Sequence, residues 1–311
     1  MKIAIVGAGI AGLSCATRLR EAGHAVSLFD KGRGPGGRMA TRRMTSDAGD
    51  IAFDHGAQYL TARDPAFVAA IHDWAATGVV ARWPAAGVDA WVGTPGMNAI
   101  VRHLAANATV FWNHRVEQVE RSDAGWHLDE ATSVFDAVVI ATPAEQAAPL
   151  LAPHDPIMAS EALACRSAPC WTAMLAFAAP LDLRGDFIRN APPIAWAARN
   201  SAKPGRNGPE AWVVQADAAW SAEHLEDTAD SVAGALTEAL EPYLGSPLPA
   251  IVARAAHRWR FARANALDLG CLWNDEERIG AAGDWLVAPR VESAWLSGRY
   301  LGDRILSGVE G

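Results

Sequence analysis

The sequence predicts an α/β fold, in which one domain is built on a parallel sheet and a second, mixed α+β domain is inserted into it. A strand, a helix and a second strand follow one another within the first 30 residues, which is the order of a βαβ unit. From about residue 150 to 265 the pattern changes to alternating strands around one helix, and a strand and a helix return after residue 266.

Three short segments make up the βαβ unit. Residues 3–6 are an apolar run of the kind that forms a buried parallel strand. Residues 10–21 place apolar side chains at helical spacing with arginines between them, and Gly23 ends that helix. Residues 25–29 form the second strand.

A glycine-rich turn, Gly7-Ala8-Gly9-Ile10-Ala11-Gly12, joins the first strand to the helix. Gly7 permits the tight turn, Gly9 a close approach to a pyrophosphate, and Gly12 close packing of the helix on the sheet. The helix begins at Ile10 and Ala11, where free N–H groups favour a phosphate. Asp30 ends the second strand, where an acid accepts hydrogen bonds from a ribose. This predicts dinucleotide binding without separating FAD from NAD.

The other elements follow from periodicity and turn residues. Residues 31–50 are rich in Gly, Arg and Pro and are predicted to lack a long regular element. Outside residues 150–265 we expect a helix over 65–76, a loop and helix over 93–107, strands over 110–112, 115–119, 126–128, 135–141 and 279–282, and a last helix over 292–306. In the inserted domain we expect strands over 171–177, 211–215 and 251–263, a helix over 228–240, and loops over 191–209 and 242–249.

Composition narrows the class of protein. The chain has 311 residues and a net charge of −8, which argues against sequence-independent nucleic-acid binding. Its four cysteines show no zinc or CxxC spacing, the histidines show no metal-binding spacing, and we expect no metal. The glycines interrupt the apolar N-terminus, so it is not read as a signal or membrane segment, and we expect a cytoplasmic protein.

The basic segment after Asp30 carries a second glycine pair, Gly36-Gly37, followed by Arg38 and Met39. Arg38 can pair with a phosphate oxygen there. The turn, the acid and this segment together resemble the flavin amine oxidase superfamily. Gly36-Gly37-Arg38-Met39 and Asp54-His55-Gly56-Ala57-Gln58-Tyr59 are similar to its renalase branch.

The resemblance implies one non-covalently bound FAD and a discontinuous Rossmann-like FAD-binding domain, formed by 1–60, 92–148 and 266–311. Residues 61–91 and 149–265 would form the substrate domain. Beyond the turn, it implies contacts to FAD from Lys31, Gly37, Arg38, Met39, Gly56, Ala57, Val116, Gly283, Asp284, Val291, Glu292, Ser293 and Ala294. Gly56 and Ala57 are small enough to pass under a flat ring. Asp284 could accept a ribityl hydroxyl, and the N-terminus of the last helix would stabilise the reduced ring.

The segment His257-Arg258-Trp259-Arg260 is a second basic cluster, in a predicted strand. His257 and Trp259 share one face of that strand and the arginines the other. The resemblance places Trp259 and Arg260 on the strand that returns to the flavin, so His257, Trp259 and Arg260 are the expected substrate residues. A half-buried strand with a solvated arginine face is the alternative.

The function implied by the resemblance is oxidation of isomeric dihydronicotinamide dinucleotides, with O2 as second substrate and H2O2 as product. The flavin would carry the chemistry, so no catalytic side chain is expected. Amine oxidases of the superfamily place a lysine near flavin N5. The chain has three lysines, and Lys203 is expected in an exposed loop. Oxidation of a small amine, desaturation of a lipid, and flavin binding without turnover stay open as alternatives.

Overall fold

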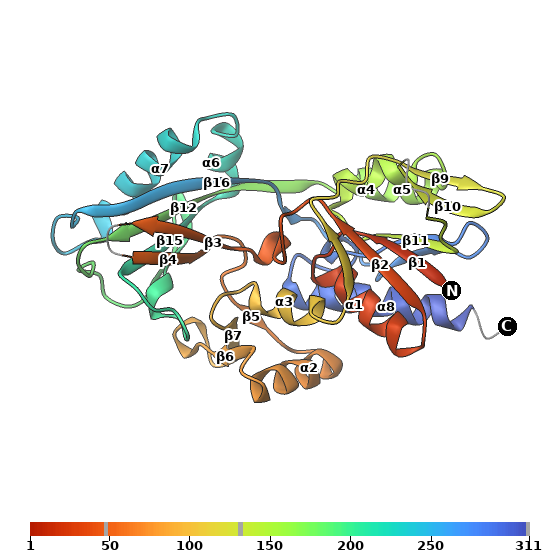
Figure 1. Ribbon diagram of the computed structural model, residues 1–311. Helices are drawn as coiled ribbons and strands as arrows, with labels where there is room; N and C mark the ends of the chain where they lie inside the picture. Colours follow the sequence, from red (N-terminus) through yellow and green to blue (C-terminus); the bar gives the residue numbers. More distant parts are fainter. Residues whose placement is uncertain (47–48, 130–132, 309–311) are drawn as a thin grey trace.

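A computed structural model describes residues 1–46, 49–129 and 133–308, and two lobes are visible in it (Figure 1). The first lobe is built on a six-stranded sheet. Its strand order is β17 (Leu272–Asn274), β18 (Ile279–Ala281), β11 (Ala137–Ile140), β1 (Lys2–Val6), β2 (Ala25–Asp30) and β8 (Thr109–Trp112). All neighbouring pairs are parallel except β17 with β18. This confirms the predicted α/β class.

Apolar side chains cover both faces of this sheet. Ile3 and Ile5 of β1 pack on the side of α1 (Ile10–Glu21) and α8 (Val291–Ser307), while Ala4 and Val6 pack on the other side. The alternation follows from the period of two in a strand. The first side also carries α3 (Ala99–Ala105), and the second α4 (Ala144–Leu151), α5 (Pro156–Ala164) and the hairpin of β9 (Val119–Ser122) and β10 (Gly125–Leu128).

The second lobe is built on an antiparallel five-stranded sheet. Its order is β13 (Phe187–Ala191), β14 (Ile194–Arg199), β15 (Glu210–Ala216), β12 (Ser167–Phe177) and β16 (Ile251–Ala264). One face packs against α7 (Ala229–Glu238), with α6 (Ala218–Glu223) and η4 (Glu241–Tyr243) nearby. The long strands β12 and β16 run from this lobe toward the first one (Figure 1).

The other face of the second sheet is covered by a hairpin that the sequence reading missed. β3 (Thr41–Ser46) and the first two residues of β4 (Gly49–Asp54) lie within residues 31–50, which were expected to lack a long regular element. Ile51 and Phe53 pack on Met174 and Val213 of the sheet. The hairpin thus packs with the second lobe, although the sequence-based boundaries group residues 1–60 with the first.

The smaller elements connect the lobes. A three-stranded sheet of β5 (Leu60–Thr61), β7 (Ala90–Gly93) and β6 (Val80–Arg82) lies beside α2 (Pro65–Ala76), with short turns at η1 (Gly37–Met39), η2 (Pro84–Ala86), η3 (Asn200–Ala202) and η5 (Asp284–Leu286). Two expectations are wrong here. Residues 115–118 are not a strand, because Asp129 accepts hydrogen bonds from the amides of Glu117 and Gln118. The expected loop over 191–209 contains β14.

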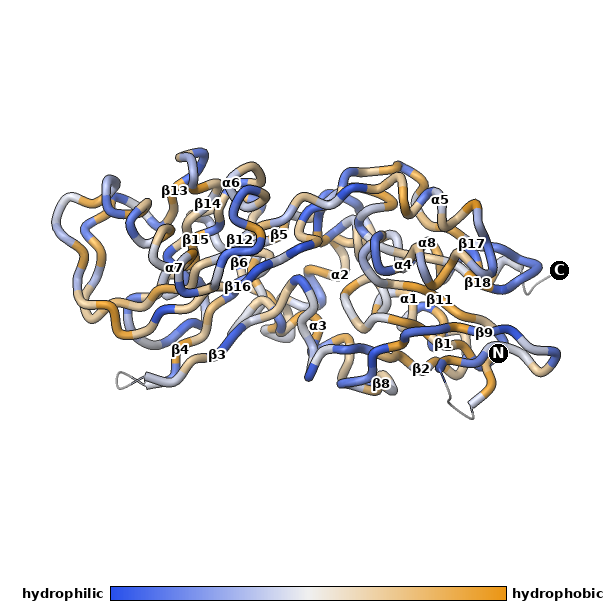
Figure 2. The backbone as a smooth tube through the Cα atoms, turned by 90° about the horizontal axis from the view of Figure 1, so that it is seen from above, coloured by the Kyte–Doolittle hydropathy of each residue, from blue (hydrophilic) through white to orange (hydrophobic). Residues whose placement is uncertain are grey.

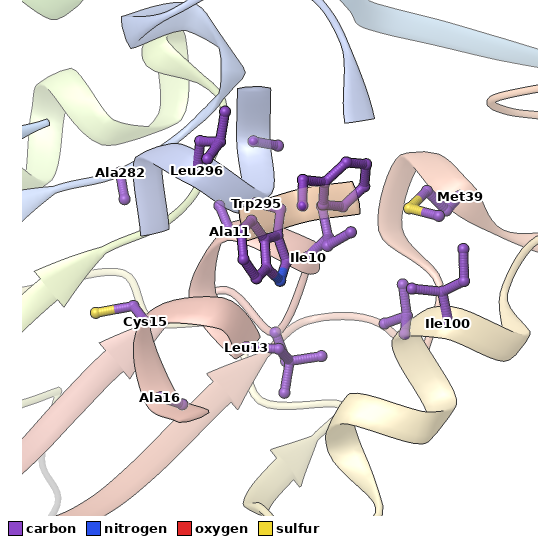
Figure 3. Close-up of a cluster of buried hydrophobic side chains, with 14 of the residues drawn as sticks. Ile10, Ala11, Leu13, Cys15, Ala16, Met39, Ile100, Ala282, Trp295 and Leu296 are labelled. Carbon is purple, nitrogen blue, oxygen red and sulfur yellow. The ribbon is translucent and has the colours of Figure 1, made fainter. Parts of the chain in front are cut away.

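The close contact of α1 and α8 anchors the first lobe. Trp295 of α8 lies beside Ile10, Ala11 and Leu13 of α1 (Figure 3). The two backbones approach so closely that a Cβ atom at Gly298 would lie 2.0 Å from the carbonyl oxygen of Ala11. Such a contact leaves no room for any side chain on α8 at this position.

Gly298→Ala should therefore destabilise the protein by about 1–3 kcal/mol or more, because a backbone atom cannot move aside. Gly234→Ala in α7 is the matched control, since a Cβ there meets nothing within 4 Å. The control should gain up to about 1 kcal/mol of helix propensity. Denaturant unfolding measures both. Equal effects of the two substitutions would contradict this account of the helix contact.

Candidate functional site

A cleft of about 2040 Å³ runs along the first lobe and under the inner ends of β12 and β16. Residues from both lobes line it, including Gly9, Asp30, Arg38, Gly56 and Trp259. Hydrophilic residues follow β3 and part of β16 between the lobes (Figure 2). Of the residues predicted to bind FAD or substrate, Gly12 and Ser293 are buried outside the lining, and the others line the cleft.

The glycine turn has the shape that a phosphate requires. Gly7 has φ +105°, a conformation that favours glycine. A Cβ at Gly12 would lie 2.1 Å from the carbonyl oxygen of Gly7, so only glycine allows this turn and helix to meet. A Cβ at Gly9 would meet no described atom within 4 Å and would enter the cleft. Gly9 is the N-cap of α1 and gives it no side-chain cap within the described residues. The N–H groups of this helix start therefore remain for a ligand.

Asp30 and Lys31 lie at the end of β2 beside this turn. The carboxylate of Asp30 accepts hydrogen bonds from the amides of Ala8 (2.8 Å) and Gly32 (2.7 Å). Because a carboxylate has about four acceptor positions, it can still accept from a ribose. Lys31 Nζ donates to Gln146 Oε1 at 3.0 Å, and burial lowers the pKa of Lys31.

Arg38 and Asp284 pair with each other, although the sequence reading gave them separate ligand contacts. The guanidinium donates to both carboxylate oxygens, at 2.9 and 2.6 Å. Asp284 is 6% exposed and follows β18, whereas Arg38 belongs to η1. Met39 beside it is buried. The bidentate pair fixes the plane of the guanidinium, and its other N–H groups have no protein partner in the described part of the chain.

The loop 55–58 forms the floor of the cleft. A Cβ at Gly56 would lie 2.0 Å from the carbonyl oxygen of Arg38, so this glycine is required by packing. The amide of Ala57 donates to that same oxygen at 2.9 Å. Gln215 Nε2 donates to the carbonyl oxygen of Gly56 at 2.9 Å. The floor therefore has small side chains at residues 56 and 57, and it is held by Arg38 of the first lobe and Gln215 of the second.

Three aromatic rings cluster at this floor, one from the loop itself (His55) and two from β16 (His257 and Trp259). His55 stacks on Trp259 with ring centroids 5.1 Å apart, and His257 lies 4.4 Å from Trp259 and 5.0 Å from His55. Trp259 Nε1 donates to the carbonyl oxygen of His55 at 2.8 Å. Burial, and then His257, lower the pKa of His55 to about 4. Burial and the nearby Arg42 lower the pKa of His257. The cluster is therefore an uncharged aromatic wall at neutral pH.

The arginines of β16 face Glu226 of the second lobe. Arg260 donates to both carboxylate oxygens of Glu226, at 2.7 and 2.9 Å, and Arg258 donates to one at 2.9 Å. These bonds lower the pKa of Glu226. Arg260 still lines the cleft, but its charge is shared with this carboxylate rather than free. The expected alternation of His257 and Trp259 against the arginines is present.

The N-terminus of α8 also lines the cleft. Val291, Glu292 and Ala294 line the cleft, and within the described residues no side chain caps this helix end. The carboxylate of Glu292 accepts from the amides of Arg63 (2.6 Å) and Asp64 (2.8 Å), so it ties α8 to the start of α2. The Gly283 amide donates to Ser297 Oγ at 2.9 Å. Two helix N-termini thus face one cleft.

The cleft is basic within an acidic protein. Eleven arginines and Lys31 line it, against five carboxylates. Arg42, Arg43 and Arg263 have no ion-pair partner in the described parts of the chain. Such a surface attracts a ligand with several negative charges and repels a cation.

Several lining residues were not predicted from the sequence. Trp196 lies in β14, which was read as a loop, and its Ile-Ala-Trp-Ala-Ala alternation was the signal for a strand. Gln215 is the polar residue near the end of an apolar strand, a pattern that indicates a side chain turned to a site. Tyr59 and Trp196 form a tilted ring pair 5.6 Å apart.

The expectation for Lys203 is wrong. Its side chain is 0% exposed and pairs with Asp54, which is also 0% exposed. The loop holds this lysine inside the protein and outside the cleft lining. Among the described residues, no cluster of His, Cys, Asp or Glu could hold a metal ion, and no helix has the length and apolarity to cross a bilayer.

The comparisons with known proteins fit this geometry. A model of the NAD(P)-binding Rossmann-like domain matches residues 5–74, and a model of flavin-containing amine oxidoreductases matches residues 84–300. The chain belongs to the flavin-containing amine oxidoreductase family. Membership implies a flavin cofactor and an oxidoreductase activity.

Several solved structures share the whole fold. Wild-type putrescine oxidase aligns with a TM-score of 0.71 at 14% identity, over 98% of this chain and 99% of that one. Cyclohexylamine oxidase from Brevibacterium oxydans aligns with a TM-score of 0.72 at 11% identity, over 100% and 99%. An oxidoreductase from Methanosarcina mazei aligns with a TM-score of 0.64 at 14% identity, over 97% and 100%. At these identities the likeness shows the fold alone.

A 4,4'-diapophytoene desaturase from Staphylococcus aureus is 51% identical over 39 residues. The match covers 12% of this chain and only 8% of the desaturase. A match of this length carries no information on the family or on the substrate.

The low pKa of His55 predicts acid sensitivity. In the folded protein His55 stays neutral down to about pH 4, while the unfolded chain binds its proton near the ordinary value of 6.5. Between these values the unfolded state holds more protons, so stability falls as the pH falls, by up to about 1.4 kcal/mol per pH unit for this group. His55→Phe keeps a ring beside Trp259 and should reduce that slope. Exposed His72→Phe should not, and an unchanged slope in His55→Phe would contradict the assignment.

Proposed function

We propose that the protein is an FAD-dependent oxidase of isomeric dihydronicotinamide dinucleotides, with FAD held non-covalently along the cleft. FAD held there would supply the redox chemistry, with hydride acceptance from the dihydronicotinamide giving NAD(P)⁺, and reoxidation by O2 with one proton from water giving H2O2. The chain's own residues bind both dinucleotides, orient the rings and exclude water.

Support for FAD comes from the shape of the cleft. Gly9 leaves space for a pyrophosphate at the start of α1, and Asp30 lies where its carboxylate would accept a hydrogen bond from a ribose hydroxyl. Gly56 and Ala57 present a small-sided floor for a flat ring. The second helix N-terminus, at Val291, would stabilise negative charge on the reduced ring. Non-covalent attachment is proposed because residues 283–294 contain no Cys or His.

The observation that carries the substrate class is the charge of the cleft. Arg42 on β3 and Arg263 on β16 border it and have no carboxylate partner among the described residues, and Arg42 is close enough to His257 to lower its pKa. A dinucleotide brings phosphates to these arginines and a ring to Trp259. A protonated amine would meet repulsion instead.

Positioning can carry most of this reaction. A dihydronicotinamide restores its aromaticity when it loses a hydride, so it needs orientation more than a base. Amine oxidase chemistry would require a lysine in the cleft near flavin N5. Lys203 does not supply it, because its side chain is buried against Asp54. His257 and Trp259 would hold the substrate ring. The proposal places the protein in the cytoplasm with the dinucleotide and O2 as its partners, and it includes no nucleic acid or membrane.

Amine oxidation is the second candidate. The putrescine and cyclohexylamine oxidases share the fold, and the ring pair of Tyr59 and Trp196 could flank a small substrate. Desaturation of a lipid and flavin binding without turnover are weaker candidates. Lipid desaturation is suggested only by the short desaturase match. Flavin binding without turnover does not explain the excess of arginines in the cleft.

Anaerobic mixing of the purified protein with separated dihydronicotinamide isomers should bleach the flavin rapidly, whereas putrescine and cyclohexylamine should not. The rate at saturation should vary little with pH, since general-base help of typically ~10²–10⁴-fold is not used.

Trp259→Ala and Arg260→Ala should slow reduction or weaken binding with the FAD content intact. Rapid bleaching by an amine, or a steep pH dependence from a single group, would contradict the proposal. Reduction by none of them would favour a binding protein.

A further inference from the structure

A buried charge network lies directly behind the cleft floor. One carboxylate oxygen of Asp54 accepts from Thr41 Oγ1 and from the Met97 amide, both at 2.8 Å. The other accepts from Lys203 Nζ at 3.3 Å and from Arg206 at 2.5 Å. The side chains of Asp54, Lys203 and Arg206 are 0%, 0% and 3% exposed.

This network is hard to explain by stability alone. The two cations lower the pKa of Asp54 despite its burial, while burial and Arg206 lower the pKa of Lys203 to about 8. Charged groups buried in this way generally give no more stability than apolar residues of the same volume. Arg206 already supplies Asp54 with a cation, so a second cation at Lys203 calls for another reason.

The second contact of Lys203 supplies that reason. Its ammonium also donates to Gln58 Oε1 at 3.2 Å. Because an ammonium only donates, the amide oxygen of Gln58 must face it and the amide nitrogen must face the other way. That nitrogen donates to the carbonyl oxygens of Asp54 and, at 3.0 Å, Gly56. Lys203 therefore decides which end of the Gln58 amide holds the loop 55–58.

The loop held in this way carries the cleft floor. Gly56 receives its second bond from Gln215, and the carbonyl oxygen of His55 receives Trp259 Nε1. Lys203 comes from the turn at η3 in the second lobe, and Arg206 donates to the Gly93 carbonyl of β7 at 2.6 Å. Both cations contact Asp54 of β4, but of the two it is Lys203 that contacts Gln58.

We propose that Lys203 is a positioning residue for the flavin: through Gln58 it sets the backbone of Gly56 and Ala57 against the ring. This rests on the proposed placement of FAD over residues 56–57. The lysine does not touch the reacting atoms. Its effect passes through one amide side chain whose orientation it fixes.

The test compares Lys203→Met with Arg206→Met, because each removes one cation from Asp54 and only the first releases Gln58. Lys203→Met should raise the Kd of the apoprotein for FAD about tenfold or more and change the visible circular dichroism of bound FAD. Arg206→Met should lower the melting temperature but keep the Kd within about twofold and the spectrum unchanged. Gln58→Leu should reproduce the effect of Lys203→Met, and the double variant should add nothing to it.

Equal FAD affinity and spectra in wild type and Lys203→Met, or equal losses in both methionine variants, would overturn the proposal and leave a structural ion pair. If Lys203→Met does not fold, Gln58→Leu keeps the charge network and decides alone, because unchanged FAD affinity there refutes the link. A wild-type protein that binds no FAD would instead overturn the proposed cofactor site, and with it this assignment.

Discussion

α1 lies between the parallel sheet and α8 at the distance of backbone contact, and the site depends on that contact. At Gly12 the helix meets the turn that leads into it, and Gly298 of α8 meets the carbonyl oxygen of Ala11. Side chains at these points would push the helices apart. Because glycine has no side chain at either point, the N-termini of α1 and α8 both open into one cleft. The same packing therefore positions the glycine turn and the start of α8.

The second lobe completes the cleft by strand alternation. β16 turns His257 and Trp259 toward the floor and Arg258 and Arg260 toward Glu226. The result is an uncharged aromatic wall beside a basic rim, in a protein whose net charge is −8. Local charge, rather than the net charge, determines which ligand such a cleft attracts. The network at Asp54 then joins β4 to the turn after η3 and to Gln58 of the floor loop.

The parts of the site that could be predicted from the sequence are those with local causes. The glycine turn, Asp30 and the alternation around Trp259 depend on residues a few positions apart, and the structure places them as expected. The pairing of Arg38 with Asp284 joins residues 246 positions apart, so no local pattern contains it. Lys203 was misjudged for the same reason, because Asn, Pro and Gly neighbours indicate a turn but do not show that its lysine meets a buried carboxylate. The hairpin β3–β4 was hidden by arginines that belong to the cleft.

If the cleft holds one FAD whose pyrophosphate lies at Gly9, the flavin content of the protein must show it. The purified protein should be yellow and carry one FAD per chain, and denaturation should release all of it into the supernatant. Gly9→Asp should be folded and colourless, because a carboxylate would occupy the place of the pyrophosphate. A colourless wild type, flavin retained on the precipitate, or full FAD content in Gly9→Asp would contradict the claim.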